Sequence, residues 1–115
     1  VGAANDEGLA YDWGFAVGLE GRRLGLDVTW SPVLDINTNP DNPIINVRAF
    51  GEEEELVSRL GAATTRGMLA AGMTPCAKHW PGHGDVALDV GESGRAGEEL
   101  LEVDATRGSG LVQRE

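Results

Sequence analysis

A group of hydrogen-bond donors near position 80 is the part of the sequence best suited to chemistry. Lys78 and His79 are adjacent, and a short loop containing Pro81 and Gly82 leads from them to His83. Lysine offers three N–H donors and histidine one or two, so these side chains suit the hydroxyls of a polyol or a carboxylate. The alternative is a solvated strand end that carries a basic pair with no ligand.

Two further charged residues, Asp35 and Arg48, follow an earlier apolar stretch. The planar guanidinium of Arg48 can donate two parallel hydrogen bonds to vicinal hydroxyls, or it can form an ion pair with a carboxylate such as that of Asp35. From these residues alone, the ion pair is the simpler expectation.

His79, His83, Asp85 and Asp89 also resemble a set of metal ligands. The H-x-x-x-H spacing suits zinc when a helix places both imidazoles on one face, and the intervening Pro-Gly pair interrupts such a helix. We therefore expect no metal and no cofactor, and a small metal-binding domain stays as a rival interpretation.

The overall composition narrows the class of protein. The 115 residues carry 19 acidic and 9 basic side chains, for a net charge of -10, which argues against binding to nucleic acid. No stretch approaches the ~18 apolar residues of a membrane span. The single cysteine, Cys76, lies in an apolar stretch, where a free cysteine is usually a small buried hydrophobe rather than a nucleophile. Composition does not distinguish a cytoplasmic from a secreted protein.

The first element that must position these residues is a helix over residues 6–24. Asn5 or Asp6 can cap its start, and Gly25 stands where a left-handed residue usually ends a helix. Apolar side chains recur at near-helical spacing and predict one buried face. That predicted face consists of Leu9, Trp13, Ala16, Val17 and Leu24.

Strand, loop, helix and strand follow in that order. Residues 28–36 are β-branched and apolar without alternation, as expected of a strand buried on both faces. Residues 37–43 are rich in Asn, Asp and Pro and predict a long loop. A second helix begins at Gly51 with four glutamates near its positive end and stops at Gly72, before a second buried strand over 73–80. Its predicted packing stripe is Leu56, Leu60, Ala63, Gly67 and Ala70.

This alternation predicts an α/β fold with a parallel sheet. In such folds, ligands bind at the carboxyl ends of the strands. The candidate residues fall there, because Asp35 ends one predicted strand, Arg48 lies in the loop after it, and Lys78 with His79 ends the next strand, ahead of His83.

Three stretches of sequence resemble the N-terminal barrel domain of glycoside hydrolase family 3. They are SPVLDI at 31–36, NPIINVRAFG at 42–51 and CAKHWPGHG at 76–84. The resemblance implies that residues 1–89 form about two βα units of a (β/α)8 TIM barrel, a fold that takes about 250 residues to close. We expect the chain, which starts at Val1 rather than at methionine, to be a piece of a longer protein with the remainder of the barrel missing.

The resemblance also implies a function. The family removes terminal β-linked sugars with retention, through a covalent intermediate on an aspartate, and includes β-glucosidases and β-N-acetylhexosaminidases. Arg48, Lys78 and His79 match residues that bind the sugar hydroxyls, while Asp35 and His83 match supporting positions. The nucleophile lies on a later strand of the family, so we expect this chain by itself to be inactive. The alternative is a non-catalytic carbohydrate-binding domain.

The sequence departs from the family's pattern at residue 91. The family's hexosaminidase branch uses an Asp-x-His pair here as the general acid and base, and Asp89 occupies the Asp position, but the His position holds Gly91. Either the acid comes from another segment, as in the β-glucosidases, or the sequence after Asp89 is no longer that of the family, and we favour the second. We therefore predict a boundary after residue 89, with 90–115 a divergent, disordered or non-native tail in which 97–105 can form a short helix.

Overall fold

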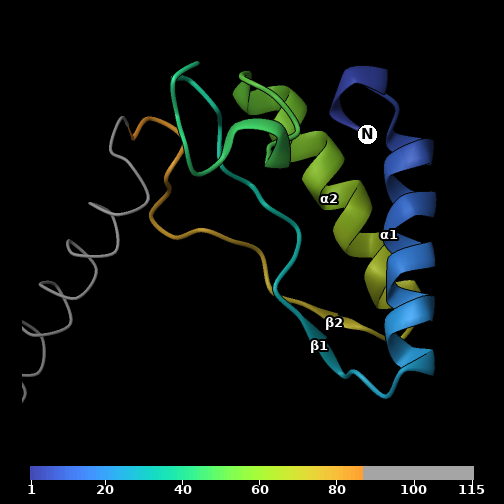
Figure 1. Cartoon of the computed structure of the whole chain (residues 1–115). Coiled ribbons are helices and arrows are strands. Elements are labelled where there is room, and N and C mark those ends of the chain that lie inside the picture. Colours follow the sequence, from blue (N-terminus) through green and yellow to red (C-terminus); the bar gives the residue numbers. More distant parts are fainter. Residues whose placement is uncertain (87–115) are drawn as a thin grey trace, which may run out of the picture.

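The structure is a computed structural model and describes residues 1–86. This part of the chain contains two long helices and two short parallel strands. Both helices lie on the same side of the strands (Figure 1). The elements in chain order are η1 Gly2–Ala4, α1 Glu7–Arg23, β1 Val28–Thr29, η2 Asn46–Arg48, α2 Glu54–Ala70 and β2 Thr74–Pro75. The predictions about Asp89, Gly91 and the tail 90–115 lie outside the described residues. Within residues 1–86, no helix is long and apolar enough to cross a bilayer.

The ends of α1 are where the sequence predicts them. The Asp6 carboxylate caps the helix by accepting a hydrogen bond from the N–H of Leu9 at 3.0 Å. Gly25 follows the last turn with a φ of 84°, a left-handed conformation that costs glycine little. The predicted helix over 6–24 is therefore confirmed.

The predicted buried face of α1 is wrong. Leu9, Trp13 and Leu24 are exposed, and the buried positions of the helix are small residues. These are Ala10, Gly14, Gly18 and Gly21. The helix packs through this ridge because residues without large side chains let a neighbouring backbone approach closely.

The neighbour is α2, which runs beside α1 (Figure 1). A Cβ atom on Gly14 would overlap the backbone carbonyl of Thr64, and one on Gly67 would overlap the carbonyl of Tyr11. Thr64 also donates a hydrogen bond from its buried hydroxyl to the carbonyl of Ala10 at 3.3 Å. The two helices are thus in backbone contact, and this contact forms the core together with the buried Leu60 and Ala63.

The packing stripe of α2 is confirmed in its middle and wrong at its end. Leu60, Ala63 and Gly67 are buried, Leu56 is half-buried, and Ala70 is exposed. Four residues that the pattern left out are buried as well, namely Val57, Gly61, Thr64 and Met68. The helix ends as predicted, with Gly72 in a left-handed conformation at a φ of 79°.

The strands are parallel, as predicted, but much shorter than predicted. β1 pairs with β2, with Val28 opposite Thr74. The predicted burial on both faces is wrong, since Val28 in β1 is 52% exposed and Trp30, just after β1, is 71% exposed. Pro32 has no N–H to donate, which breaks a regular ladder at that point. Beyond Pro32 the two segments still form backbone hydrogen bonds. Leu34 N–H donates to the carbonyl of Lys78 at 2.6 Å, and Lys78 N–H donates to the carbonyl of Pro32 at 3.0 Å.

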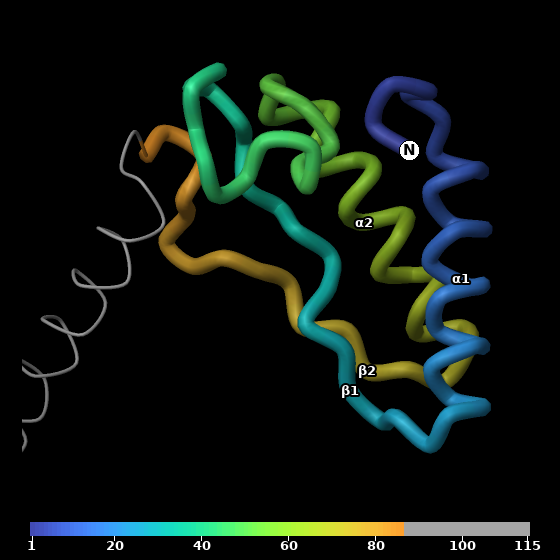
Figure 2. The backbone as a smooth tube through the Cα atoms, in the orientation of Figure 1, coloured from blue at the N-terminus to red at the C-terminus, as the bar shows by residue number. Residues whose placement is uncertain are grey.

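The segments that follow the two strands separate and then come together again toward the same end of the molecule (Figure 2). They carry residues 33–38 and 78–85, which are joined by the bridge between Val33 and Lys78. The fold therefore brings the two predicted strand ends together, as a parallel sheet requires.

Candidate functional site

The centre of the site is the carboxylate of Asp35, in the extended segment that follows β1. Its side chain is 0% exposed and accepts three hydrogen bonds. Oδ2 lies 2.6 Å from Nδ1 of His79 and 3.2 Å from the backbone nitrogen of the same residue. Oδ1 accepts the backbone N–H of His83 at 2.6 Å. Asp35 thus holds both ends of the Pro-Gly loop that follows β2.

These contacts decide the charge of Asp35. Burial acts most strongly on the pKa of this carboxyl and raises it, but the hydrogen bond from the His79 ring, the N–H of His83 and the positive charge of the imidazole together outweigh burial. The pKa of Asp35 therefore lies below its ordinary value, and the group is a carboxylate at neutral pH.

The ionised carboxylate in turn orients His79. A carboxylate can only accept, so Nδ1 of His79 carries the hydrogen in this pair. The other ring nitrogen, Nε2, makes no hydrogen bond within residues 1–86, and the side chain is 24% exposed. His79 therefore presents one ring nitrogen to a ligand while the other is fixed.

A hollow of about 450 Å³ adjoins this pair. Asp35, His79, Gly82 and Asp85 are among its lining residues. The His83 ring lies beside that of His79, with centroids 5.0 Å apart and planes tilted by 60°. The structure thus places two of the predicted site residues, Asp35 and His79, at this hollow, and a third, His83, beside His79.

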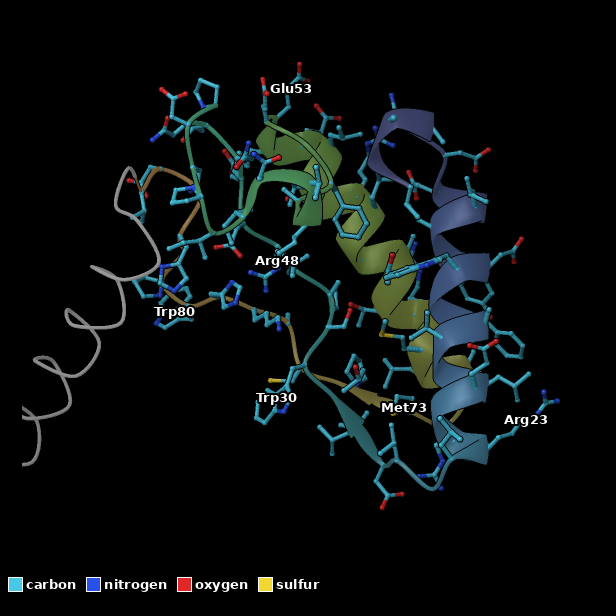
Figure 3. All side chains as sticks on the ribbon, in the orientation of Figure 1. Arg23, Trp30, Arg48, Glu53, Met73 and Trp80 are labelled. Atoms are coloured by element: carbon cyan, nitrogen blue, oxygen red, sulfur yellow. The ribbon has the colours of Figure 1, made fainter. Side chains whose placement is uncertain are left out.

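Within residues 1–86, neither Lys78 nor Arg48 makes a side-chain hydrogen bond to Asp35, His79 or His83. The backbone of Lys78 pairs with the chain after β1, and its side chain is half-buried. Arg48, at the end of η2, is exposed and donates to the carbonyl of Ile44 at 2.9 Å. It lines a second hollow of about 300 Å³ with Pro32. Figure 3 shows Arg48 in the region toward which both strands point.

The ion pair between Arg48 and Asp35, expected from these residues alone, is wrong. The Asp35 oxygens are already occupied by His79 and by the N–H of His83, and the guanidinium of Arg48 turns to Ile44 instead.

Two asparagines that the sequence marked only as loop residues take part in the site. Asn42 is 1% exposed and donates from Nδ2 to the carbonyl of His83 at 2.5 Å. Asn39 donates from Nδ2 to the carbonyl of Val86 at 3.3 Å. Asn residues in a Pro-rich stretch predict turns, and nothing in the sequence marks which of them is buried against a distant loop.

The metal-ligand interpretation finds no geometry in the part of the chain that the structure describes. Within residues 1–86, no group of three or more His, Cys, Asp and Glu side chains is placed to hold a metal ion. One nitrogen of His79 is also committed to Asp35.

Comparison with known proteins decides the family. The family model described as "Glycosyl hydrolase family 3 N terminal domain" matches residues 1–103. The chain belongs to glycosyl hydrolase family 3. The match to this family extends past residue 89, where the sequence predicts a boundary, and that boundary stays a prediction.

Two proteins named as beta-hexosaminidases are similar to this chain in sequence. Beta-hexosaminidase A of Pseudoalteromonas piscicida is 46% identical over 74 residues, which are 64% of this chain and 12% of that protein. Beta-hexosaminidase of Bordetella pertussis is 41% identical over 81 residues, 70% of this chain and 23% of that protein. The chain therefore spans less than a quarter of the length of either relative.

A solved structure supports the fold. The family 3 beta-N-acetylglucosaminidase of Paenibacillus sp. FPU-7 superimposes with a TM-score of 0.75 at 49% identity, covering 76% of this chain and 17% of that one. The predicted fold class, part of a (β/α)8 barrel, is confirmed.

Proposed function

We propose that this chain forms the part of an exo-acting β-N-acetylhexosaminidase that binds the terminal sugar. Arg48, Lys78 and His79 donate hydrogen bonds to the sugar hydroxyls, and Asp35 and His83 support them. The observation that carries the proposal is the contact of 2.6 Å between Asp35 and His79 at the carboxyl ends of two parallel strands. Ligands of barrel enzymes meet the loops at this end.

The chemistry of the three proposed sugar-binding residues fits an uncharged, hydroxyl-rich ligand. Lysine and arginine offer only donors, and His79 offers Nε2, so together they suit the oxygens of a sugar. The guanidinium of Arg48 is exposed and its partner is a backbone carbonyl, so it can turn to a ligand without leaving a buried charge unpaired.

The choice of an N-acetylhexosamine follows the relatives. Two of them are named beta-hexosaminidases, and the superimposed structure is a beta-N-acetylglucosaminidase. In this proposal Asp89 takes part in general acid and base chemistry, although the family's partner position holds Gly91. The nucleophile comes from a strand that this chain does not contain, so the chain alone is an inactive piece of the enzyme, divergent beyond residue 89.

A graft tests the proposal. Residues 1–89 of this chain replace the matching segment of the Paenibacillus beta-N-acetylglucosaminidase, which supplies the rest of the barrel; we call this protein the grafted enzyme. It is expected to hydrolyse 4-nitrophenyl N-acetyl-β-D-glucosaminide and to lose this activity when Lys78 or His79 is replaced. A folded grafted enzyme without turnover, or one whose turnover is indifferent to both substitutions, contradicts the proposal.

A further inference from the structure

The carboxamide of Asn42 joins two loops that are far apart in the sequence. Its Oδ1 accepts the N–H groups of Ile44 and Ile45, both at 2.8 Å, and so closes the turn in which it stands. Its Nδ2 donates across to the carbonyl of His83 at 2.5 Å. With the residue 1% exposed, water cannot readily replace these bonds.

The peptide groups of His83 are consequently held from two sides. Asp35 accepts the N–H of His83 at 2.6 Å, while Asn42 donates to its carbonyl. The next residue, Gly84, is packed so tightly on the backbone of Ile36 that an added Cβ would overlap the Ile36 carbonyl. His83 is therefore fixed by two buried side chains and by the close contact of the following glycine.

The position of His83 matters because its ring lies against that of His79, with centroids 5.0 Å apart. We propose that Asn42 is a positioning residue of the sugar site, which fixes the His83 peptide and thereby the ring that packs on His79. This inference rests on the proposed function, in which His79 binds the sugar, and it adds a residue from a loop that does not itself reach His79.

The variant Asn42→Asp isolates the bond between the loops. A carboxylate still accepts the N–H groups of Ile44 and Ile45, but it cannot donate to His83 and sets an oxygen against the His83 carbonyl. Asn37→Asp is the matched control. Asn37 lies in the same loop and accepts the N–H of Asn46 at 3.1 Å, and within residues 1–86 its carboxamide makes no bond to the His83 loop.

The experiment uses the grafted enzyme at a temperature well below its melting point, where parent and variants are fully folded. Asn42→Asp is expected to raise the inhibition constant of N-acetylglucosamine and to lower kcat/KM, each by about tenfold, the size of one hydrogen bond. Asn37→Asp is expected to leave both constants within twofold of the parent. If Asn42→Asp does not fold, Asn42→Ser replaces it, because its shorter hydroxyl can still accept from Ile44 but cannot reach His83.

The outcomes separate this inference from the proposed function. Parent-like inhibition and kcat/KM in a folded Asn42 variant overturn the positioning role, as does an equal loss in the Asn37 control. Kinetics that do not respond to Lys78→Ala and His79→Ala overturn the proposed function instead, whatever the Asn42 variants do.

Discussion

Asp35 Oδ2 and His79 Nδ1 lie 2.6 Å apart although 44 residues separate them in the chain. The contact joins the end of one βα unit to the end of the next, at the edge of the sheet where the two extended segments meet. The carboxylate is fully buried, and the His79 ring donates a hydrogen bond to it. The buried carboxylate of Asp35 therefore orients His79, the candidate ligand-binding histidine.

The first prediction is a pH dependence of stability. The pKa of Asp35 is lower in the folded protein than in the unfolded chain, so between the two values the unfolded state binds more protons. The stabilisation by Asp35 is thus complete above the unfolded value of about 3.9 and is lost as the pH falls through the lower folded value. Urea unfolding of the grafted enzyme between pH 7 and pH 3 measures it.

Asp35→Asn is the control, since it removes the titrating group. At pH 7 this substitution is expected to cost about 1–3 kcal/mol, the range for an impaired buried hydrogen-bond group. The difference between parent and variant should shrink as the pH falls below 4. A difference that stays constant over the whole range would show that the charge of Asp35 contributes nothing.

The second prediction concerns Lys78 and His79 in the grafted enzyme. Each substitution by alanine is expected to lower kcat/KM roughly a hundredfold, about 3 kcal/mol, because hydrogen bonds to sugar hydroxyls strengthen in the transition state. The melting temperature should change little. Arg66→Ala, which removes an exposed cation on α2, serves as the control and should leave kcat/KM unchanged. A large fall in melting temperature with near-normal kinetics would assign the pair to fold stability.

How far the sequence predicts the fold depends on the kind of signal. The ends of α1 are local features, since Asp6 and Gly25 act within one turn, and they are predicted correctly. The packing face of α1 is not predicted, because apolar spacing emphasises Leu9 and Trp13, whereas the contact depends on how closely Gly14 lets a second backbone approach. Periodicity measures hydrophobicity and carries no information about such close approach.

The candidate site follows the same division. The α/β alternation predicts that Asp35 and His79 follow neighbouring parallel strands, so their presence toward one end of the sheet is predictable. Their direct contact, and the burial of Asn42 against His83, depend on the path of the two loops. Loop paths are set by contacts between residues far apart in the chain, which a single sequence does not display.

The third prediction is that the 115-residue chain by itself does not hydrolyse aryl β-glycosides. The resemblance places the nucleophile on a strand that the chain does not contain. The second position after Asp89, where the resemblance implies a histidine, holds Gly91. Release of 4-nitrophenol is measured for the chain and for its Asp35, Lys78 and Asp89 variants. Turnover that disappears with these substitutions would contradict the prediction, whereas turnover that survives all of them indicates a contaminant.

The fourth prediction is that the isolated chain self-associates. Within residues 1–86 the sheet has two strands, so the outer edge of each is unpaired, and Trp30 is 71% exposed beside β1. Light scattering should detect species larger than a monomer. Trp30→Lys should reduce their amount, while Ala16→Lys, at an exposed position of α1, should not. A monodisperse monomer that melts cooperatively above ~65 °C would contradict the prediction that the unpaired strand edges cause self-association.

The last prediction tests the contact between the helices. Gly14→Ala places a methyl group where the carbonyl of Thr64 lies, and a backbone atom cannot move aside as a flexible side chain can. The helices must separate, so we expect a loss of about 1–3 kcal/mol or more in the free energy of unfolding of the grafted enzyme, the cost of an overpacked core. This loss should exceed the gain of up to ~1 kcal/mol that alanine otherwise brings over glycine in a helix. Ala16→Ser adds one atom to an exposed position of the same helix and should stay within about 0.5 kcal/mol of the parent. If Gly14→Ala stabilises the protein, helix propensity governs this position and α1 does not need its glycine ridge to reach α2.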